Sequence, residues 1–441
     1  MSNRISETII SSLLTFKLIL SLNDNWESYV ASNKYEVREV EKREVTKMLG
    51  CMDPERGGYS VYICVECGEQ KKIPHSCKSR ICSSCGKRHA DEWAEKINKE
   101  MYAVPYRHII LTITDRLWIY FEGNSRMQKL MLDTAGEVMK EIVRKFNNRK
   151  KKAEPGIIMV LHPFGRDLKT NMHVHMLMTE GGLTSSGEWV EMPYIDYKII
   201  RKKWQYAILT ALRKANPGNK ELDKIIDWCF KERTNGFNIQ AKRRIEGKTK
   251  QAARYMARYV RHPAIADSRI IGYDTQNVTF VYEREGKTHT VIMDKFEFIH
   301  NVVKHIPDQN FKMVRYYGIH SRRAKKNVRE VMEKLGKVIK YIIKPFSWQK
   351  NVTQYAGKDP LKCEKCFGEM QLYKVVYRNR NGELKEYGDL HKFIEKITVR
   401  GMIADEKEKA KIGVKASRAA NRNQLCLFEL RSKRGDTSRC A

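Results

Sequence analysis

The sequence contains no hydrophobic run long enough to cross a membrane. Its longest apolar stretch near the amino terminus, residues 9–22, is interrupted by Thr15, Lys17 and Ser21, whereas a spanning helix needs about 20 predominantly apolar residues. The same stretch follows charged residues and has no small-residue cleavage site, so no secretory signal is expected. We therefore expect a cytoplasmic protein with no membrane partner.

Motifs that define several other enzyme classes are also missing. There is no GxxxxGK[ST] loop of the kind found in helicase motors, and no GxSxG turn of a serine hydrolase. Long Ser, Gly or Gln tracts are absent, and 41% of the 441 residues are hydrophobic, which indicates a folded chain. Because the helicase loop is missing, any reaction of this chain that needs separated nucleic-acid strands is expected to depend on a host helicase.

Acidic residues are scarce relative to basic ones. Lys and Arg total 84 against 52 Asp and Glu, which gives a formal net charge of +32 that is spread over most of the length. Such an excess favours a polyanionic partner. Because no membrane-spanning segment is present, we expect that partner to be nucleic acid.

The cysteines are concentrated in one segment, because six of the eleven lie between positions 51 and 85. In a reducing compartment, CxxC spacing indicates metal binding rather than disulfides. Two CxxC pairs, Cys64 with Cys67 and Cys82 with Cys85, predict one tetrahedral zinc site. Four protein ligands leave no position for water, so this zinc is expected to stabilise structure.

Further candidate ligands leave the number of zinc ions open. Four residues of the same segment could form a second site or replace a ligand: Cys51, His75, Cys77 and His89. A third pair, Cys363 with Cys366, has no second pair nearby, and Cys51, His391 or Cys426 could complete it through space. Basic residues of the zinc segment, Lys78 and Arg80 among them, could contact DNA phosphates.

The central region alternates strand and helix patterns, which predicts an α+β fold. Strand patterns cover 107–114, 157–161 and 172–179, and helical spacing covers 125–146, 197–215 and 249–261. In the strand at 172–179, His173 and His175 alternate with apolar residues. Both imidazoles therefore face the same side, about 7 Å apart, where they could bind one divalent ion.

Two tyrosines, Tyr255 and Tyr259, are spaced i and i+4 on the last of these helices, so their Cβ atoms are expected about 6 Å apart. Phosphoryl transfer needs a nucleophile, a cation for the non-bridging oxygens and a group that stabilises the leaving oxygen. A tyrosine, a bound metal and Arg254 or Arg258 would meet these needs. The resulting 5′ phosphotyrosine conserves the energy of the phosphodiester, so the second tyrosine or another strand end can reverse it.

These motifs together resemble the two-tyrosine rolling-circle transposases of the insertion sequence ninety-one family, which are related to the Helitron transposases. The resemblance covers about residues 10–330 and rests on the zinc segment at 74–86, the strand region at 161–175, the helix at 254–260 and the motif at 315–318. It implies an HUH nuclease palm, with Mg²⁺ or Mn²⁺ bound by His173 and His175 and with Tyr255 and Tyr259 as nucleophiles. It also implies single-stranded DNA at transposon ends and target DNA as partners, in the bacterial cytoplasm at the nucleoid.

The resemblance leaves the third metal ligand open. HUH enzymes usually have a third polar ligand, and no spacing argument selects among Asn171, Gln240 and Gln251.

The expected organisation has five segments. They are a helical segment at 1–48, a zinc-binding domain at 49–98, the two-tyrosine nuclease at 99–270, an accessory DNA-binding region at 271–345, and a CxxC segment with a basic tail at 346–441. Two alternatives remain: a replication initiator or relaxase with the same chemistry, and a non-catalytic zinc-dependent DNA-binding protein. Cleavage that leaves protein on a 5′ end would distinguish the enzymes from the binder.

Overall fold

The structure, a computed structural model, describes residues 14–146, 152–192, 196–246, 249–260, 263–338, 349, 352–353, 357–379 and 383–388. The chain divides into two discontinuous units. The first comprises Met1–Leu49 and Lys78–Ile343, and the second comprises Gly50–Cys77 and Lys344–Ala441. Each unit is described by itself below.

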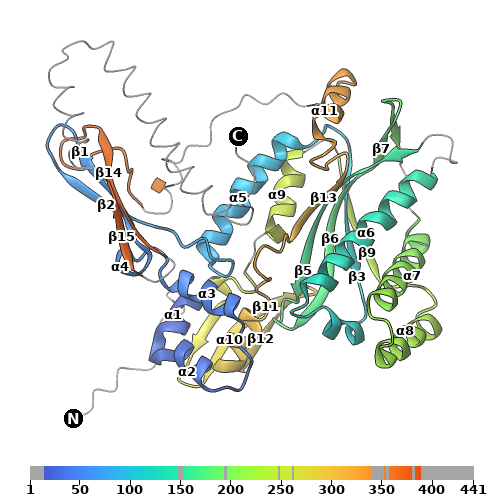
Figure 1. Cartoon of the computed structure of the whole chain (residues 1–441), viewed down its shortest axis with the longest axis horizontal. Coiled ribbons are helices and arrows are strands. Elements are labelled where there is room, and N and C mark those ends of the chain that lie inside the picture. The colour runs from blue at the N-terminus through green and yellow to red at the C-terminus, as the bar shows by residue number, and fades with distance from the viewer. Residues whose placement is uncertain are drawn as a thin grey trace. The chain divides into compact units, whose positions relative to one another are not determined.

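An antiparallel five-stranded sheet forms the centre of the first unit (Figure 1). In spatial order its strands are β13 (Val314–Gly318), β5 (Gly156–Phe164), β6 (Thr170–Thr179), β3 (Tyr106–Thr112) and β9 (Ile239–Ile245). β6 is central and pairs with β5 on one side and β3 on the other. A residue on β6 therefore has close neighbours on β5, which directly precedes it in the sequence, and on β3, which lies much earlier in the sequence.

Helices cover both faces of this sheet (Figure 1). One face packs against α6 (Ser125–Phe146), α7 (Tyr197–Ala215) and α8 (Lys220–Glu232), and the other packs against α5 (Ser83–Glu100), α9 (Thr249–Val260) and α11 (Lys325–Lys334). Successive side chains of a strand point to opposite faces of the sheet. Val174 and Met176 therefore pack in the core under α6, α7 and α8, and Leu177 packs in the core under α5, α9 and α11.

Smaller elements complete the first unit. A three-stranded sheet consists of β10 (Ile270–Tyr273), β11 (Asn277–Arg284) and β12 (Lys287–Asp294); it packs with α1 (Phe16–Ser21), α2 (Asn25–Ala31) and α10 (Lys295–Val303), where the Phe16 and Phe298 ring centroids are 5.9 Å apart. A second small sheet consists of β4 (Ala153–Glu154), β7 (Gly181–Thr184) and β8 (Trp189–Glu191). The remaining helices are α3 (Glu39–Leu49), η2 (Leu22–Asp24), η3 (Asp115–Tyr120) and η4 (Asp267–Arg269).

The second unit is a four-stranded antiparallel sheet built from two distant parts of the sequence. Its order is β15 (Leu384–Tyr387), β14 (Met370–Arg378), β1 (Tyr59–Cys64) and β2 (Gln70–Pro74), and the short α4 (Pro54–Gly57) precedes β1. β1 pairs with β14 from Tyr59 opposite Val376 to Cys64 opposite Met370. The carboxy-terminal strands therefore complete a sheet that the amino-terminal strands begin.

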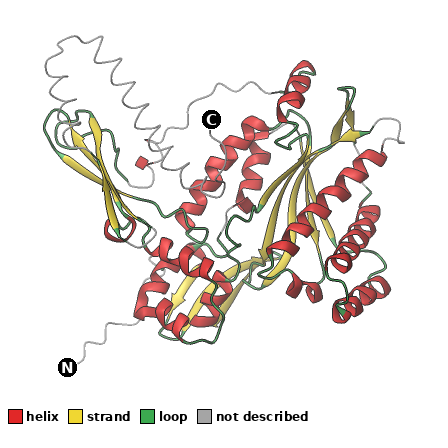
Figure 2. Cartoon of the chain, in the orientation of Figure 1, coloured by secondary structure: helices red, strands yellow, loops and turns green. Residues whose placement is uncertain are grey.

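The mixture of helices and antiparallel sheets confirms the expected α+β class (Figure 2). The strand patterns correspond to β3, β5 and β6, and the helical patterns to α6, α7 and α9. The elements that were not expected include α5, α8 and the edge strand β13. The five-segment organisation stays a prediction. In the part of the chain that the structure describes, no helix has the length and apolarity needed to cross a membrane.

Candidate active site and cysteine clusters

Three histidines meet on the sheet face that α9 covers. His173 and His175 lie on β6, and His162 lies on β5 directly opposite His173. The ring nitrogens of these residues all lie within 4.8 Å of one another. The alternation along β6 predicted the first two residues, whereas His162 joins them through the pairing of β5 with β6.

The geometry of this cluster fits a divalent metal ion. The Nε2 atoms of His173 and His175 are 3.1 Å apart, and two nitrogens bound at adjacent positions of one ion are about 3.0 Å apart. Nδ1 of His173 lies 2.7 Å from the Asn171 carbonyl oxygen, so it can donate its proton there and leave Nε2 free to bind metal. Burial lowers the pKa of His173, which favours the neutral, ligating form.

Helix α9 places both tyrosines beside the histidines. The Tyr259 ring stacks on the His175 ring, with centroids 3.6 Å apart and an interplanar angle of 16°. The Tyr259 hydroxyl donates a hydrogen bond of 3.3 Å to the Tyr255 hydroxyl. Burial and this bond raise the pKa of Tyr259. The two candidate nucleophiles thus lie next to each other and to the candidate metal cluster.

His108, which the sequence patterns did not single out, connects the histidine cluster to Tyr255. It lies on β3 and is 1% exposed. Its Nε2 is 3.0 Å from Nδ1 of His175, and its Nδ1 is 3.3 Å from the Tyr255 hydroxyl. If His175 binds metal through Nε2, its proton is on Nδ1 and is donated to His108. A neutral His108 then carries its own proton on Nδ1, directed at the Tyr255 oxygen.

Basic side chains surround the tyrosines. The Arg258 guanidinium is 5.5 Å from the Tyr255 ring centroid, and Arg254, one helical turn earlier, is exposed. Arg80 lines a solvent-open cleft of about 480 Å³ together with His162 and Tyr259. Three of the four predicted DNA-contacting residues therefore lie on α9 or at this cleft. The fourth, Lys78, is half-buried and has a positive φ of 52°.

His162 is the third histidine of the cluster and could serve as a third metal ligand, for which three other residues were considered. Asn171 contributes its backbone carbonyl to His173, Gln240 lies on β9 opposite Ile110, and Gln251 is exposed on α9. These three residues stay candidates, and the structure adds His162 to them. Sequence spacing could not select His162, because its closeness to His173 depends on strand pairing.

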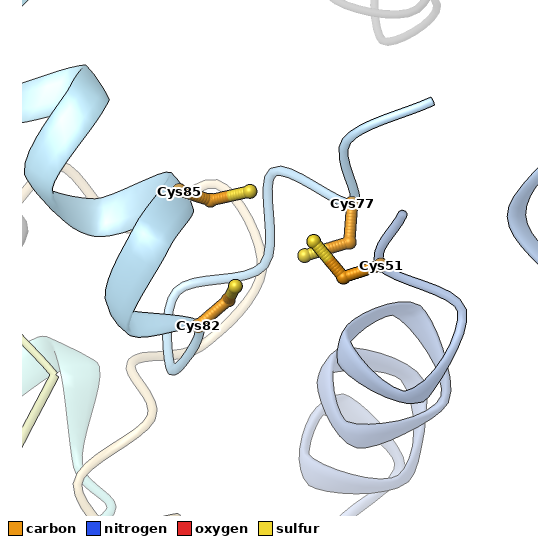
Figure 3. A group of neighbouring side chains, drawn as sticks. All are labelled: Cys51, Cys77, Cys82 and Cys85. Carbon is orange, nitrogen blue, oxygen red and sulfur yellow. The ribbon is translucent and has the colours of Figure 1, made fainter. Parts of the chain in front are cut away.

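Four cysteines form one cluster beside α5. Cys82 and Cys85 lie at its amino-terminal end, Cys77 precedes them, and Cys51 follows α3. Figure 3 shows the four side chains pointing toward one another, and their sulfur atoms lie within 4.8 Å of one another. Four cysteine sulfurs are a donor set that suits structural zinc.

A second cluster consists of Cys64, Cys67, Cys363 and Cys366. The predicted site that joined Cys64 and Cys67 to the pair at 82 and 85 is therefore wrong, because each pair has different partners. Spacing predicts which cysteines form pairs but not which pairs meet.

Among the residues that the structure describes, the other candidate zinc ligands do not join these two clusters. His75 belongs to neither cluster of the described residues, and its Nε2 is 2.9 Å from the Ser60 hydroxyl. Of the three expected partners for the pair at 363 and 366, Cys51 belongs to the other cluster, and His391 and Cys426 lie outside the described residues.

Comparisons with known proteins match both parts of the site. Residues 156–328 match the family described as "Putative transposase", and residues 21–113 match "Transposase zinc-binding domain". The first match contains the three clustered histidines and both tyrosines. The second contains the cysteine cluster beside α5.

Two curated proteins are similar over most of their length. The chain is 27% identical over 304 residues to the transposase for insertion sequence element IS801 of Pseudomonas savastanoi pv. phaseolicola, covering 65% of this chain and 72% of that protein. It is 25% identical over 306 residues to "Putative transposase y4qJ" of Sinorhizobium fredii (strain NBRC 101917 / NGR234), covering 64% and 75%. No solved structure matches the chain significantly.

Proposed function

We propose that this chain is a transposase of the insertion sequence ninety-one family, to which its matches to two transposase families and its similarity to the IS801 transposase point, and that it nicks and rejoins single-stranded DNA at element ends through tyrosine nucleophiles. The observation that carries this proposal is the arrangement of two tyrosine hydroxyls, 3.3 Å apart, beside three clustered histidines. In this reading the five-stranded sheet with α9 is the palm of an HUH nuclease.

The reaction is a transesterification at phosphorus. The tyrosine hydroxyl loses its proton as its oxygen bonds to phosphorus, the bond from phosphorus to the 3′ oxygen breaks, and the leaving oxygen takes up a proton. The products are a 5′ phosphotyrosine and a free 3′ hydroxyl. A divalent ion such as Mg²⁺ or Mn²⁺, held by His162, His173 and His175, would supply positive charge to the non-bridging oxygens.

The hydrogen bonds favour Tyr255 as the first nucleophile. Its oxygen is within hydrogen-bonding distance of Nδ1 of His108 and accepts the hydroxyl proton of Tyr259. Hydrogen bonds donated to an attacking oxygen stabilise the charge that it carries in the transition state, so these two donors favour attack by Tyr255. Tyr259, which donates rather than accepts, is suited to the second transfer.

The remaining groups bind DNA and stabilise the fold. Arg254 and Arg258 on α9, together with Arg80 at the cleft, would neutralise phosphates of a single strand next to the tyrosines. The cysteine cluster beside α5 would hold a structural zinc, because four thiolates close the coordination shell.

The direct test is formation of a covalent protein–DNA adduct. Purified protein is incubated with Mn²⁺ or Mg²⁺ and labelled single-stranded oligonucleotides that tile the DNA flanking the gene, and then separated on a denaturing gel. We expect an adduct on the 5′ end of the cleaved strand that Tyr255→Phe reduces to a residual, Tyr259-dependent level. Tyr259→Phe should form this adduct but fail to transfer the strand.

A matched control uses Tyr206→Phe, since Tyr206 is 65% exposed on α7 and should leave the adduct unchanged. Folded, metal-loaded protein that gives no adduct would support a non-catalytic DNA-binding protein instead. An adduct without strand transfer to a second oligonucleotide would favour a replication initiator or relaxase.

A further inference from the structure

We propose a second structural zinc site whose ligands come from both ends of the chain. Its four ligands are Cys64, Cys67, Cys363 and Cys366. The sulfur of Cys64 is 3.4 Å from that of Cys366, and the sulfur of Cys67 is 3.7 Å from that of Cys363. Sulfurs of a tetrahedral zinc site are about 3.8 Å apart, whereas bonded sulfurs of a disulfide are about 2.05 Å apart.

The two CxxC pairs have similar turn geometry. The Cys64 N–H donates to the Glu69 carbonyl oxygen at 2.8 Å, and the Cys363 N–H donates to the Gly368 carbonyl oxygen at 2.9 Å, in both turns five residues further along the chain. In each turn the fourth residue after the first cysteine has a left-handed backbone, with φ of 72° at Gly68 and 60° at Phe367. The two turns bring all four sulfur atoms within 4.8 Å of one another.

Contacts outside the sulfurs hold the carboxy-terminal turn in place. Lys71 on β2 is buried, and its Nζ donates to the carbonyl oxygens of Asp359 and Lys362 at 3.0 and 2.7 Å. The same ammonium is 3.2 Å from the Glu364 carboxylate. Lys71 thus attaches the loop that carries Cys363 to the hairpin of β1 and β2.

The small core of this unit needs such a site. Its buried cluster among the described residues has only six members, two of which are the ligands Cys64 and Cys363. A hydrophobic core of this size does not stabilise a domain alone, and a metal commonly compensates. Four soft thiolate donors with no open position select zinc in a structural role.

The first test counts zinc in the full-length protein by plasma mass spectrometry. We expect two zinc ions per chain, falling to one in Cys363→Ser/Cys366→Ser and to one in Cys82→Ser/Cys85→Ser. The matched control is Cys229→Ala, a buried cysteine of α8, which should keep both. One ion in the wild type that survives loss of the pair at 363 and 366 would overturn the proposal.

A second measurement uses the wild-type chain and so does not depend on variants that fold. Cys67 and Cys366 are exposed, so burial does not protect their thiols from iodoacetamide. We expect both to react slowly until a zinc chelator is added, and then faster by at least about tenfold, as read by peptide mass spectrometry. Equal rates with and without the chelator would refute a metal at this position.

Discussion

Replacing His108 by Phe should slow the first DNA cleavage by impairing Tyr255. The substitution keeps an aromatic ring in a buried position but removes Nδ1, which lies 3.3 Å from the Tyr255 hydroxyl. A hydrogen bond to a charged group contributes about 1.5–3 kcal/mol. Loss of that stabilisation at the attacking oxygen corresponds to a rate about 10- to 150-fold lower. The assay is single-turnover adduct formation at saturating oligonucleotide.

The variant also removes the partner of Nδ1 of His175, which by itself would weaken metal binding about 10- to 100-fold. Saturating Mn²⁺ and a double-mutant cycle with Tyr255→Phe separate the two effects. If His108 acts through Tyr255, His108→Phe slows cleavage in the wild-type background but not the residual, Tyr259-dependent cleavage of Tyr255→Phe. An equal decrease in both backgrounds would show that His108 acts only through the metal cluster, and the proposed order of the tyrosines would lose its basis.

Four further changes test other parts of the structure. Lys71→Met should lower the free energy of unfolding in urea by about 1–3 kcal/mol, because two partly buried backbone carbonyls lose their donor; an unchanged urea midpoint would contradict this role. Gly318→Ala should lower the melting temperature, since an added Cβ would lie 1.7 Å from the Pro155 carbonyl oxygen and a left-handed alanine alone costs about 1–2 kcal/mol. Arg254→Gln should weaken single-stranded DNA binding and reduce the slope of log affinity against log salt by about 0.7, with an unchanged slope excluding a phosphate contact. Burial lowers the pKa of His320 to about 4, so the unfolded state binds more protons between about pH 6.5 and 4, and stability should fall as the pH is lowered through that range; a His320→Gln variant with the same pH dependence would refute this.

The candidate nucleophiles and two metal ligands could be predicted because their geometry is local. Alternation along one strand puts His173 and His175 on the same face, and one helical turn separates Tyr255 from Tyr259. Both statements need only the secondary structure of a single segment, and β6 and α9 are the elements that the patterns predicted.

The other site residues were not predicted because they depend on pairing between strands rather than on the pattern of one segment. His162 faces His173 only through the register of β5 with β6, and His108 reaches His175 from β3. The cysteine pairs meet through β1 and β14 in the same way. One signal was available for His162, which lies at the end of a predicted strand eleven residues before the first histidine of the motif.

The pairing of β1 with β14 also sets a delay on folding during synthesis. Residues opposite each other in this ladder, such as Cys64 and Met370, are separated by about 300 positions, which a ribosome takes roughly 15–60 s to translate. Throughout that time β1 has its β2 neighbour but lacks the strand on its other edge. The four-stranded sheet can therefore form completely only after the ribosome has translated β14 and β15. A chain that stops earlier is released with an unpaired edge on β1.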